Sequence, residues 1–168
     1  MVVVKKNFLN KDDFNNIKSK LFSFDFPWFF QSKMTSDGLG WENPFFFHCF
    51  YDNSLPSMYF NLFEDSLKKL KVESLIKIRA NLNLNFKERY YSDWHYDQET
   101  PCKVALLYLN TNNGYTEIKD EEKILKVNCE ENKMVIFDSY HLHRLVSQTD
   151  NQRRIAINFN FYDLKKEK

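Results

Sequence analysis

The clearest pattern in the chain is an alternation of apolar and polar residues over positions 75–85. Successive side chains of a strand point to opposite faces, so this run predicts a strand with one apolar and one polar face. Arg79, Asn81 and Asn83 share the polar face. The other face is expected to pack in the core. Arg79 is either an exposed strand residue or, as we favour, a cation on the side of a pocket.

Two stretches have apolar residues at the spacing of an amphipathic helix. Residues 11–22 repeat apolar side chains every three or four positions, and Asp12 and Asp13 lie where a helix N-terminus favours negative charge. Residues 59–72 show the same spacing and carry several lysines toward their end. We predict a helix over each stretch.

Further strands are predicted wherever short apolar or alternating runs lie between turn-like connections. They are residues 24–30, 44–51, 104–109, 115–118, 124–127, 134–137 and 155–161. Turns are predicted at residues 36–40, 110–114 and 149–152. His143 would come from a separate strand. Two helices followed by strands, without alternation of strand and helix, predict a mainly β (α+β) fold, an antiparallel sandwich or jelly roll backed by helices.

Composition narrows the possible functions. The 168 residues suit one domain with a continuous core, and the 43% hydrophobic and 17% aromatic content excludes a disordered chain. A balance of 24 basic and 23 acidic residues gives a net charge of +1, which provides no overall attraction to nucleic acid or acidic lipid. Nucleic acid is therefore an unlikely partner.

The cysteines and the apolar runs indicate the compartment. Cys49, Cys102 and Cys129 are odd in number and form no CxxC pair, so neither a disulfide framework nor a zinc knuckle is indicated. The N-terminal apolar stretch is shorter than a signal peptide requires, and no later run approaches membrane-spanning length. We expect a cytoplasmic protein with no membrane segment.

A possible metal site is formed by His95 and Asp97, within Trp94-His95-Tyr96-Asp97, together with the distant His143. Residues two apart on an extended chain share a face, so two imidazoles and one carboxylate could bind one side of a metal ion. This ligand set suits Fe(II) and leaves other positions open, whereas a structural zinc site would need four ligands. His141 competes with His143, but the Arg-Leu-Val after His143 and the distance to the arginines favour His143.

An arginine near the C-terminus offers a second kind of binding group. In the predicted strand 155–161, Arg154 shares a face with Ala156 and Asn158, so its guanidinium can point into a pocket without crowding. The planar guanidinium suits bidentate binding of a carboxylate such as that of a 2-oxo-diacid. Arg153 is the alternative, but Arg154 fits the strand register better.

These motifs together resemble the Fe(II)/2-oxoglutarate-dependent dioxygenases, particularly the prolyl-hydroxylase-like branch. They are Trp94–Asp97, Leu107–Asn110, Phe137-Asp138, His143-Arg144 and Arg154–Phe159. The resemblance covers about residues 75–162 in the family's order. It implies a double-stranded β-helix (jelly-roll) catalytic core over 75–162, supported by helices and strands of residues 1–74, in a single domain 1–168.

The resemblance also implies roles for individual residues. His95, Asp97 and His143 would be the catalytic Fe(II) ligands, and Arg154 would bind the 5-carboxylate of the co-substrate 2-oxoglutarate. Tyr108 would support the same carboxylate through its hydroxyl. One further residue, Asn81 on the preceding strand, would lie near 2-oxoglutarate or the substrate.

The activity that the resemblance implies is that of a dioxygenase, most simply a hydroxylase, that uses O2 and 2-oxoglutarate and releases succinate and CO2. The substrate is open between a peptidyl residue such as proline and a small metabolite, with a nucleobase least favoured. One alternative is a cupin-like jelly roll that binds a metal or ligand without oxidising it, and another is a structural module with incidental histidines. The sequence does not indicate an oligomeric state.

Overall fold

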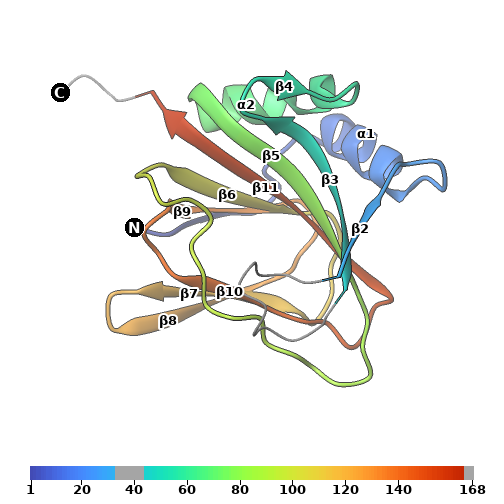
Figure 1. Cartoon of the computed structure of the whole chain (residues 1–168), viewed down its shortest axis with the longest axis vertical. Coiled ribbons are helices and arrows are strands. Elements are labelled where there is room, and N and C mark those ends of the chain that lie inside the picture. The colour runs from blue at the N-terminus through green and yellow to red at the C-terminus, as the bar shows by residue number, and fades with distance from the viewer. Residues whose placement is uncertain (33–43, 165–168) are drawn as a thin grey trace.

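Two antiparallel sheets face each other, and the helices cover the outer side of the larger sheet (Figure 1). The computed structural model describes residues 1–32 and 44–164. The turn predicted at residues 36–40 lies outside the described residues. Because every strand pair in the two sheets is antiparallel, short connections suffice to join them.

The larger sheet has the strand order β1-β9-β6-β11-β5-β3-β2, with β4 paired to β3. Its strands are β1 (Val3–Lys5), β2 (Phe29–Gln31), β3 (Phe45–Asp52), β4 (Leu55–Pro56), β5 (Val72–Leu84), β6 (Lys103–Tyr108), β9 (Lys133–Asp138) and β11 (Arg153–Asp163). The long strands β5 and β11 pair along their length at its centre. Strands from both the N-terminal and the C-terminal part of the chain therefore share one sheet.

The smaller sheet has the order β10-β7-β8, formed by β7 (Tyr115–Asp120), β8 (Lys123–Asn128) and β10 (His143–Val146). Tyr91 and His95 add isolated bridges to Val146 and His143 on the free edge of β10. From β5 onward the chain passes back and forth between the two sheets, which is the winding of a jelly roll.

The helices bury an apolar stripe against the larger sheet. In α1 (Lys11–Phe22) the side chains of Phe14, Ile17 and Leu21 are buried, and the Asn10 side chain caps the helix N-terminus by accepting a hydrogen bond from the Asp13 amide at 2.9 Å. A 3-10 turn, η1 (Phe60–Phe63), leads into α2 (Glu64–Leu70). No helix in the described residues has the length and apolar character needed to cross a bilayer.

The two faces of β5 and β11 have different surroundings. Toward the helices both strands contribute apolar side chains to the main core, among them Ile78, Leu82, Ile157 and Phe159. Toward the smaller sheet β6, β7 and β9 contribute a second apolar cluster. The remainder of that inner face is polar, because the alternation in sequence places arginine and asparagine side chains of β5 and β11 there.

Most predicted elements are confirmed, with three differences. Residues 59–72 form η1 and then α2 instead of one helix. Lys71 adopts a left-handed conformation (φ 56°), which ends α2 before β5. The strand predicted over residues 24–30 is confirmed only at its end, where Phe29 and Phe30 belong to β2. Ser23 caps α1 and begins a turn with Phe26, so only Phe29–Gln31 is extended. Neither β1, which pairs with β9, nor β4, which pairs with β3, was predicted, because strands of two or three residues carry too little pattern.

Candidate metal centre

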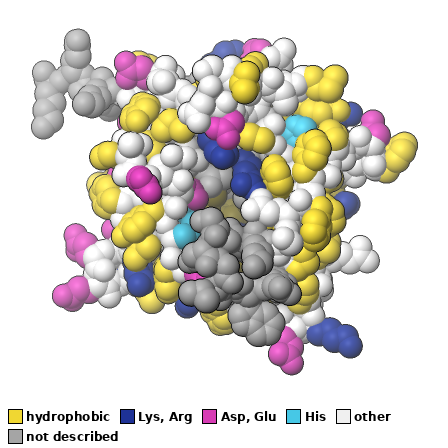
Figure 2. All heavy atoms as spheres, viewed as in Figure 1, with side chains coloured by type: hydrophobic (Ala, Val, Ile, Leu, Met, Phe, Trp, Pro, Cys, Tyr) yellow, Lys and Arg dark blue, Asp and Glu magenta, His cyan; other side chains and the backbone are white. Residues whose placement is uncertain are grey.

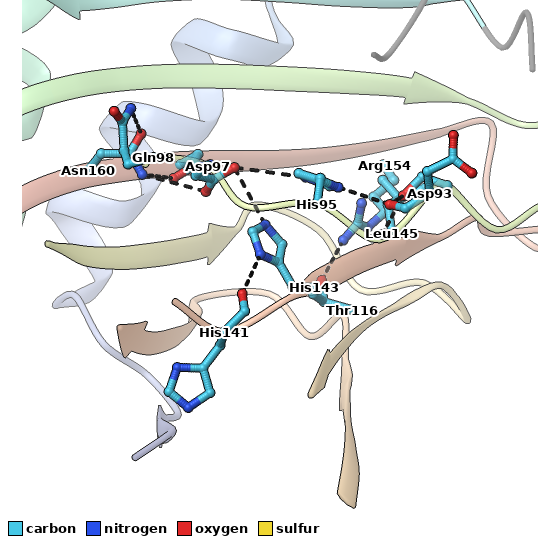
Figure 3. Close-up of polar contacts among 12 residues, drawn as sticks. Asp93, His95, Asp97, Gln98, Thr116, His141, His143, Leu145, Arg154 and Asn160 are labelled. Carbon is cyan, nitrogen blue, oxygen red and sulfur yellow. Dashed lines mark hydrogen bonds and ion pairs between the residues drawn. The ribbon is translucent and has the colours of Figure 1, made fainter. Parts of the chain in front are cut away.

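His95, Asp97 and His143 converge between the two sheets (Figure 3). His143 is the first residue of β10, and the backbones of His95 and His143 exchange two hydrogen bonds of 3.1 Å. This bridge brings the two imidazole centroids to 4.5 Å. Asp97 lies in a bend two residues after this bridge.

The three side chains present their ligand atoms to a common space. Asp97 Oδ1 lies 3.5 Å from His143 Nε2 and 3.9 Å from His95 Nε2, and one ligand atom from each residue lies within 4.8 Å of the others. Metal bonds of about 2 Å place neighbouring ligand atoms roughly 3 to 3.5 Å apart. Two nitrogens and one carboxylate oxygen on one side of such a space fit a transition-metal ion such as Fe(II).

Hydrogen bonds around the three residues fix the orientation that a metal needs. His95 Nδ1 lies 3.0 Å from the Asp93 carbonyl oxygen, and His143 Nδ1 lies 3.3 Å from that of His141. When each Nδ1–H donates to its carbonyl, the Nε2 lone pairs face Asp97. Asn158 Nδ2 donates to Asp97 Oδ2 at 2.6 Å, which leaves Oδ1 free to face the histidines.

The triad is electrostatically coupled. Burial would raise the pKa of Asp97, but the charges of His143 and His95 and the hydrogen bond from Asn158 lower it well below its ordinary value. Burial and the charge of His143 lower the pKa of His95. Burial alone would lower the pKa of His143, but the charge and hydrogen bond of Asp97 outweigh it and raise the pKa. Asp97 is therefore ionised, as a metal ligand must be.

The structure separates the competing residues. The His141 ring points away from the triad, and its Nε2 lies 3.0 Å from Asp120 Oδ1 (Figure 3). Arg153 packs its guanidinium over the Phe22 ring at 4.3 Å, on the helix side of the sheet. The geometry places His143 and Arg154, the preferred residues, at the site.

A cavity of about 80 Å3 extends from the triad toward Arg154. The Arg154 side chain is 3% exposed, and its Nε and Nη2 donate to Cys129 Sγ at 2.9 Å and Thr116 Oγ1 at 3.1 Å. Among the described residues no carboxylate forms an ion pair with it. A buried guanidinium facing a cavity without a counter-charge suits an anionic ligand, because burying an unpaired charge is costly.

Solved structures with the same fold include prolyl hydroxylases, a 2OG-Fe(II) oxygenase family oxidoreductase and an alpha ketoglutarate dependent epimerase from nogalamycin biosynthesis. A prolyl hydroxylase from Trichoplax adhaerens, in complex with a hypoxia inducible factor peptide fragment, aligns over 96% of this chain and 83% of its own with a TM-score of 0.71 and 14% identity. A Pseudomonas putida prolyl-4-hydroxylase aligns over 97% and 92% (TM-score 0.70, 12% identity), and a 2OG-Fe(II) oxygenase family oxidoreductase from Burkholderia pseudomallei over 96% and 85% (TM-score 0.70, 9% identity). The sequence matches no protein-family model and no curated protein.

The chain has the fold of the 2OG-Fe(II) oxygenases. The predicted fold class, a mainly β jelly roll braced by helices, is confirmed. At identities this low the likeness supports the fold alone. The candidate triad is an independent observation made on the side chains of this chain.

In this 2OG-Fe(II) oxygenase fold Tyr108 does not border the cavity itself but contacts Thr116, which does. It is fully buried, does not line the cavity, and donates its hydroxyl to Thr116 Oγ1 at 2.8 Å. Burial raises the pKa of Tyr108, so its hydroxyl remains a donor. Because Thr116 accepts from both Tyr108 and Arg154, its own O–H is left to donate into the cavity that it lines.

Thr116 was not identified from the sequence. The sequence signal that could have identified it is the alternation along β7. Thr116 and Ile118 share the inward face of this strand, and the residues that follow each of them point outward. Asn81, which was identified, lines the cavity, and its buried Oδ1 has no hydrogen-bond partner. Asn83 lies next to it on the same wall and pairs in register with Arg154.

Proposed function

We propose that this chain is an Fe(II)- and 2-oxoglutarate-dependent dioxygenase that hydroxylates a C–H bond of a peptidyl residue or small metabolite with O2, releasing succinate and CO2. The observation that carries the proposal is one cavity that joins a histidine, aspartate and histidine triad to a buried arginine, which has no carboxylate partner within residues 1–32 and 44–164. A site that only binds metal has no use for such an arginine. This separates the proposal from a cupin-like binding protein.

His95, Asp97 and His143 would hold Fe(II). The backbone bridge between the two histidines and the amide of Asn158 orient their ligand atoms before the metal arrives, so that little order must be gained on binding. Because the ligands occupy one side, other positions remain for co-substrate and O2.

Arg154 and Thr116 would bind the remote carboxylate of 2-oxoglutarate. The guanidinium is held by Cys129 and Thr116, which fixes its direction. Both groups are buried between the sheets, where a charged hydrogen bond is stronger than at the surface. Tyr108 would act behind Thr116 as a positioning residue, and Asn81 would offer its unpaired oxygen to the co-substrate or substrate.

Succinate formation by purified variants tests the proposal. His95→Ala or Asp97→Ala should abolish succinate formation, since either change removes a metal ligand. Arg154→Ala should mainly raise the concentration of 2-oxoglutarate that is required, by about 10- to 100-fold, because a charged hydrogen bond contributes about 1.5 to 3 kcal/mol.

Two residues beside the site provide matched controls. His141→Ala removes a histidine outside the triad, and Arg153→Ala removes an arginine that lines neither the triad nor its cavity. Both should retain succinate formation and the 2-oxoglutarate requirement of the wild type. Unchanged turnover in all of the triad and Arg154 variants would reject the proposal.

A further inference from the structure

A second cavity of about 200 Å3 is lined by His95 and Asp97 of the triad. It shares Asn81, His95, Asp97 and Asn158 with the first cavity, but not Arg154. Its wall continues along the polar face of β5 and β11 to Arg79, which pairs in register with Asn158. His95 and Asp97 therefore line both cavities, and each cavity has one arginine on its wall.

Arg79 is held firmly in its place on this wall. Its guanidinium carbon lies 4.2 Å from the ring centroid of Phe47 and 5.4 Å from that of Phe45. Nη2 donates to Gln31 Oε1 at 2.7 Å. Stacking on aromatic rings and one neutral acceptor fix the direction of the planar group without neutralising its charge.

In the part of the chain that the structure describes, no counter-charge contacts Arg79. Its Nε is buried without a hydrogen-bond partner, and no ion pair within residues 1–32 and 44–164 includes it. Burial lowers the pKa of Arg79 from its ordinary 12.5, partly offset by nearby charges including that of Asp97. An arginine still remains protonated at neutral pH. Among the described residues, Gln31 is the one hydrogen-bond acceptor for this guanidinium, so its charge is left for a ligand to neutralise.

The neighbouring cation on the same strand is already neutralised. Lys77 Nζ lies 3.0 Å from Asp52 Oδ2. On the face drawn in Figure 2, basic side chains gather over the middle of β5. With a dication and 2-oxoglutarate in place, the charges of metal, Asp97, co-substrate and Arg154 would cancel, which leaves Arg79 as an unbalanced positive charge beside the triad.

We infer that the second cavity binds the substrate and that Arg79 binds a carboxylate of a small acidic substrate. This inference rests on the proposed function and narrows its substrate class. The volume lies below the roughly 300 to 1,000 Å3 of pockets for drug-sized ligands, so a small molecule fills it. Asn81, Gln98, Asn158 and Asn160 line the same cavity and offer amide hydrogen bonds to further polar groups of such a molecule.

The test measures binding to the full chain saturated with Zn(II) and 2-oxoglutarate, where no turnover consumes the probe. Probes are the L-amino acids and linear mono- and dicarboxylic acids of three to six carbons, each paired with its carboxamide. Two further sets of probes complete the panel. One set replaces the carboxylate of each acid with a phosphate, and the other presents the acid as a side chain of a capped tripeptide. Isothermal titration calorimetry gives each affinity.

At least one free acid should bind the wild type about 10- to 100-fold more tightly than its carboxamide. Arg79→Gln should remove this preference while leaving the affinity for 2-oxoglutarate within about threefold of the wild type. Arg79→Lys keeps the charge but loses the planar guanidinium, so it should retain part of the preference for the free acid. If Arg79→Gln does not fold, Arg79→Lys is the variant that tests the inference. Arg153→Gln, an arginine outside both cavities, should behave as the wild type.

The inference fails if 2-oxoglutarate binds normally but no free acid binds, if acid and carboxamide bind equally, or if only the phosphates or the tripeptides bind. It also fails if the Arg79 variants keep the full preference. Failure of the wild type to bind 2-oxoglutarate in the presence of metal is seen before any probe is added, and overturns the proposed function together with the inference.

Discussion

The two histidines of the triad differ in how readily they lose a proton so that a metal can bind. His95 has a pKa below its ordinary 6.5, because burial and the charge of His143 disfavour its protonated form. The pKa of His143 lies above 6.5, because Asp97 stabilises its protonated form more than burial opposes it. His143 is therefore the ligand at which protons compete with the metal at the highest pH.

This difference predicts the pH dependence of metal binding. A metal must displace the proton from His143, so affinity should be constant well above its pKa and fall about tenfold per pH unit below it. The fall should begin above pH 6.5, because the pKa of His143 is raised. Zn(II) competition titrations between about pH 5.5 and 8.5 measure this. Affinity that stays flat down to pH 6 would contradict the assigned electrostatics.

Residue types and spacing were enough to select the triad and Arg154, because their chemistry depends on few residues. The sequence could not show that Thr116 stands between Tyr108 and Arg154, since this depends on how two sheets face each other. It also could not show that Arg79 has no counter-charge among the residues that the structure describes. That follows only from the places of Gln31 and Phe47 on neighbouring strands.

At the scale of elements, α1 and β5 show how pattern and packing agree. The apolar stripe of α1 and the apolar face of β5 meet in the same core, so both were predictable from periodicity. Residues 24–28 were mispredicted because they belong to an apolar run that suggested a strand, whereas Ser23 and Phe26 form a turn after the helix. Local hydrogen bonds decided against the propensity there.

The N-terminal cap of α1 gives a prediction at this scale. Asn10→Ala removes the side-chain acceptor for the Asp13 amide and should lower the free energy of unfolding by about 1 kcal/mol, within a range of 0.5 to 2. Asn15→Ala, an exposed change within the same helix, is the control and should not destabilise. Urea denaturation followed by circular dichroism measures both. Equal stability of the two variants would show that the cap does not stabilise the helix.

At the scale of the molecule, the site exists because distant segments are brought together by the jelly roll. The segment 91–95 bridges to β10, which places His95 beside His143, while β11 supplies Arg154 and Asn158 from the opposite sheet. The order of helices and strands in the sequence predicted this class of fold. The strand order within each sheet is a long-range property that the local pattern does not carry.

The central claim is that one cavity binds Fe(II) and 2-oxoglutarate together. The most direct measurement is the visible charge-transfer band that forms when Fe(II) and 2-oxoglutarate are added anaerobically to the purified protein. The account predicts this band for the wild type and its loss in Asp97→Ala, with Arg154→Ala requiring more 2-oxoglutarate to form it. Absence of the band in the folded wild type at saturating Fe(II) and 2-oxoglutarate would contradict the account.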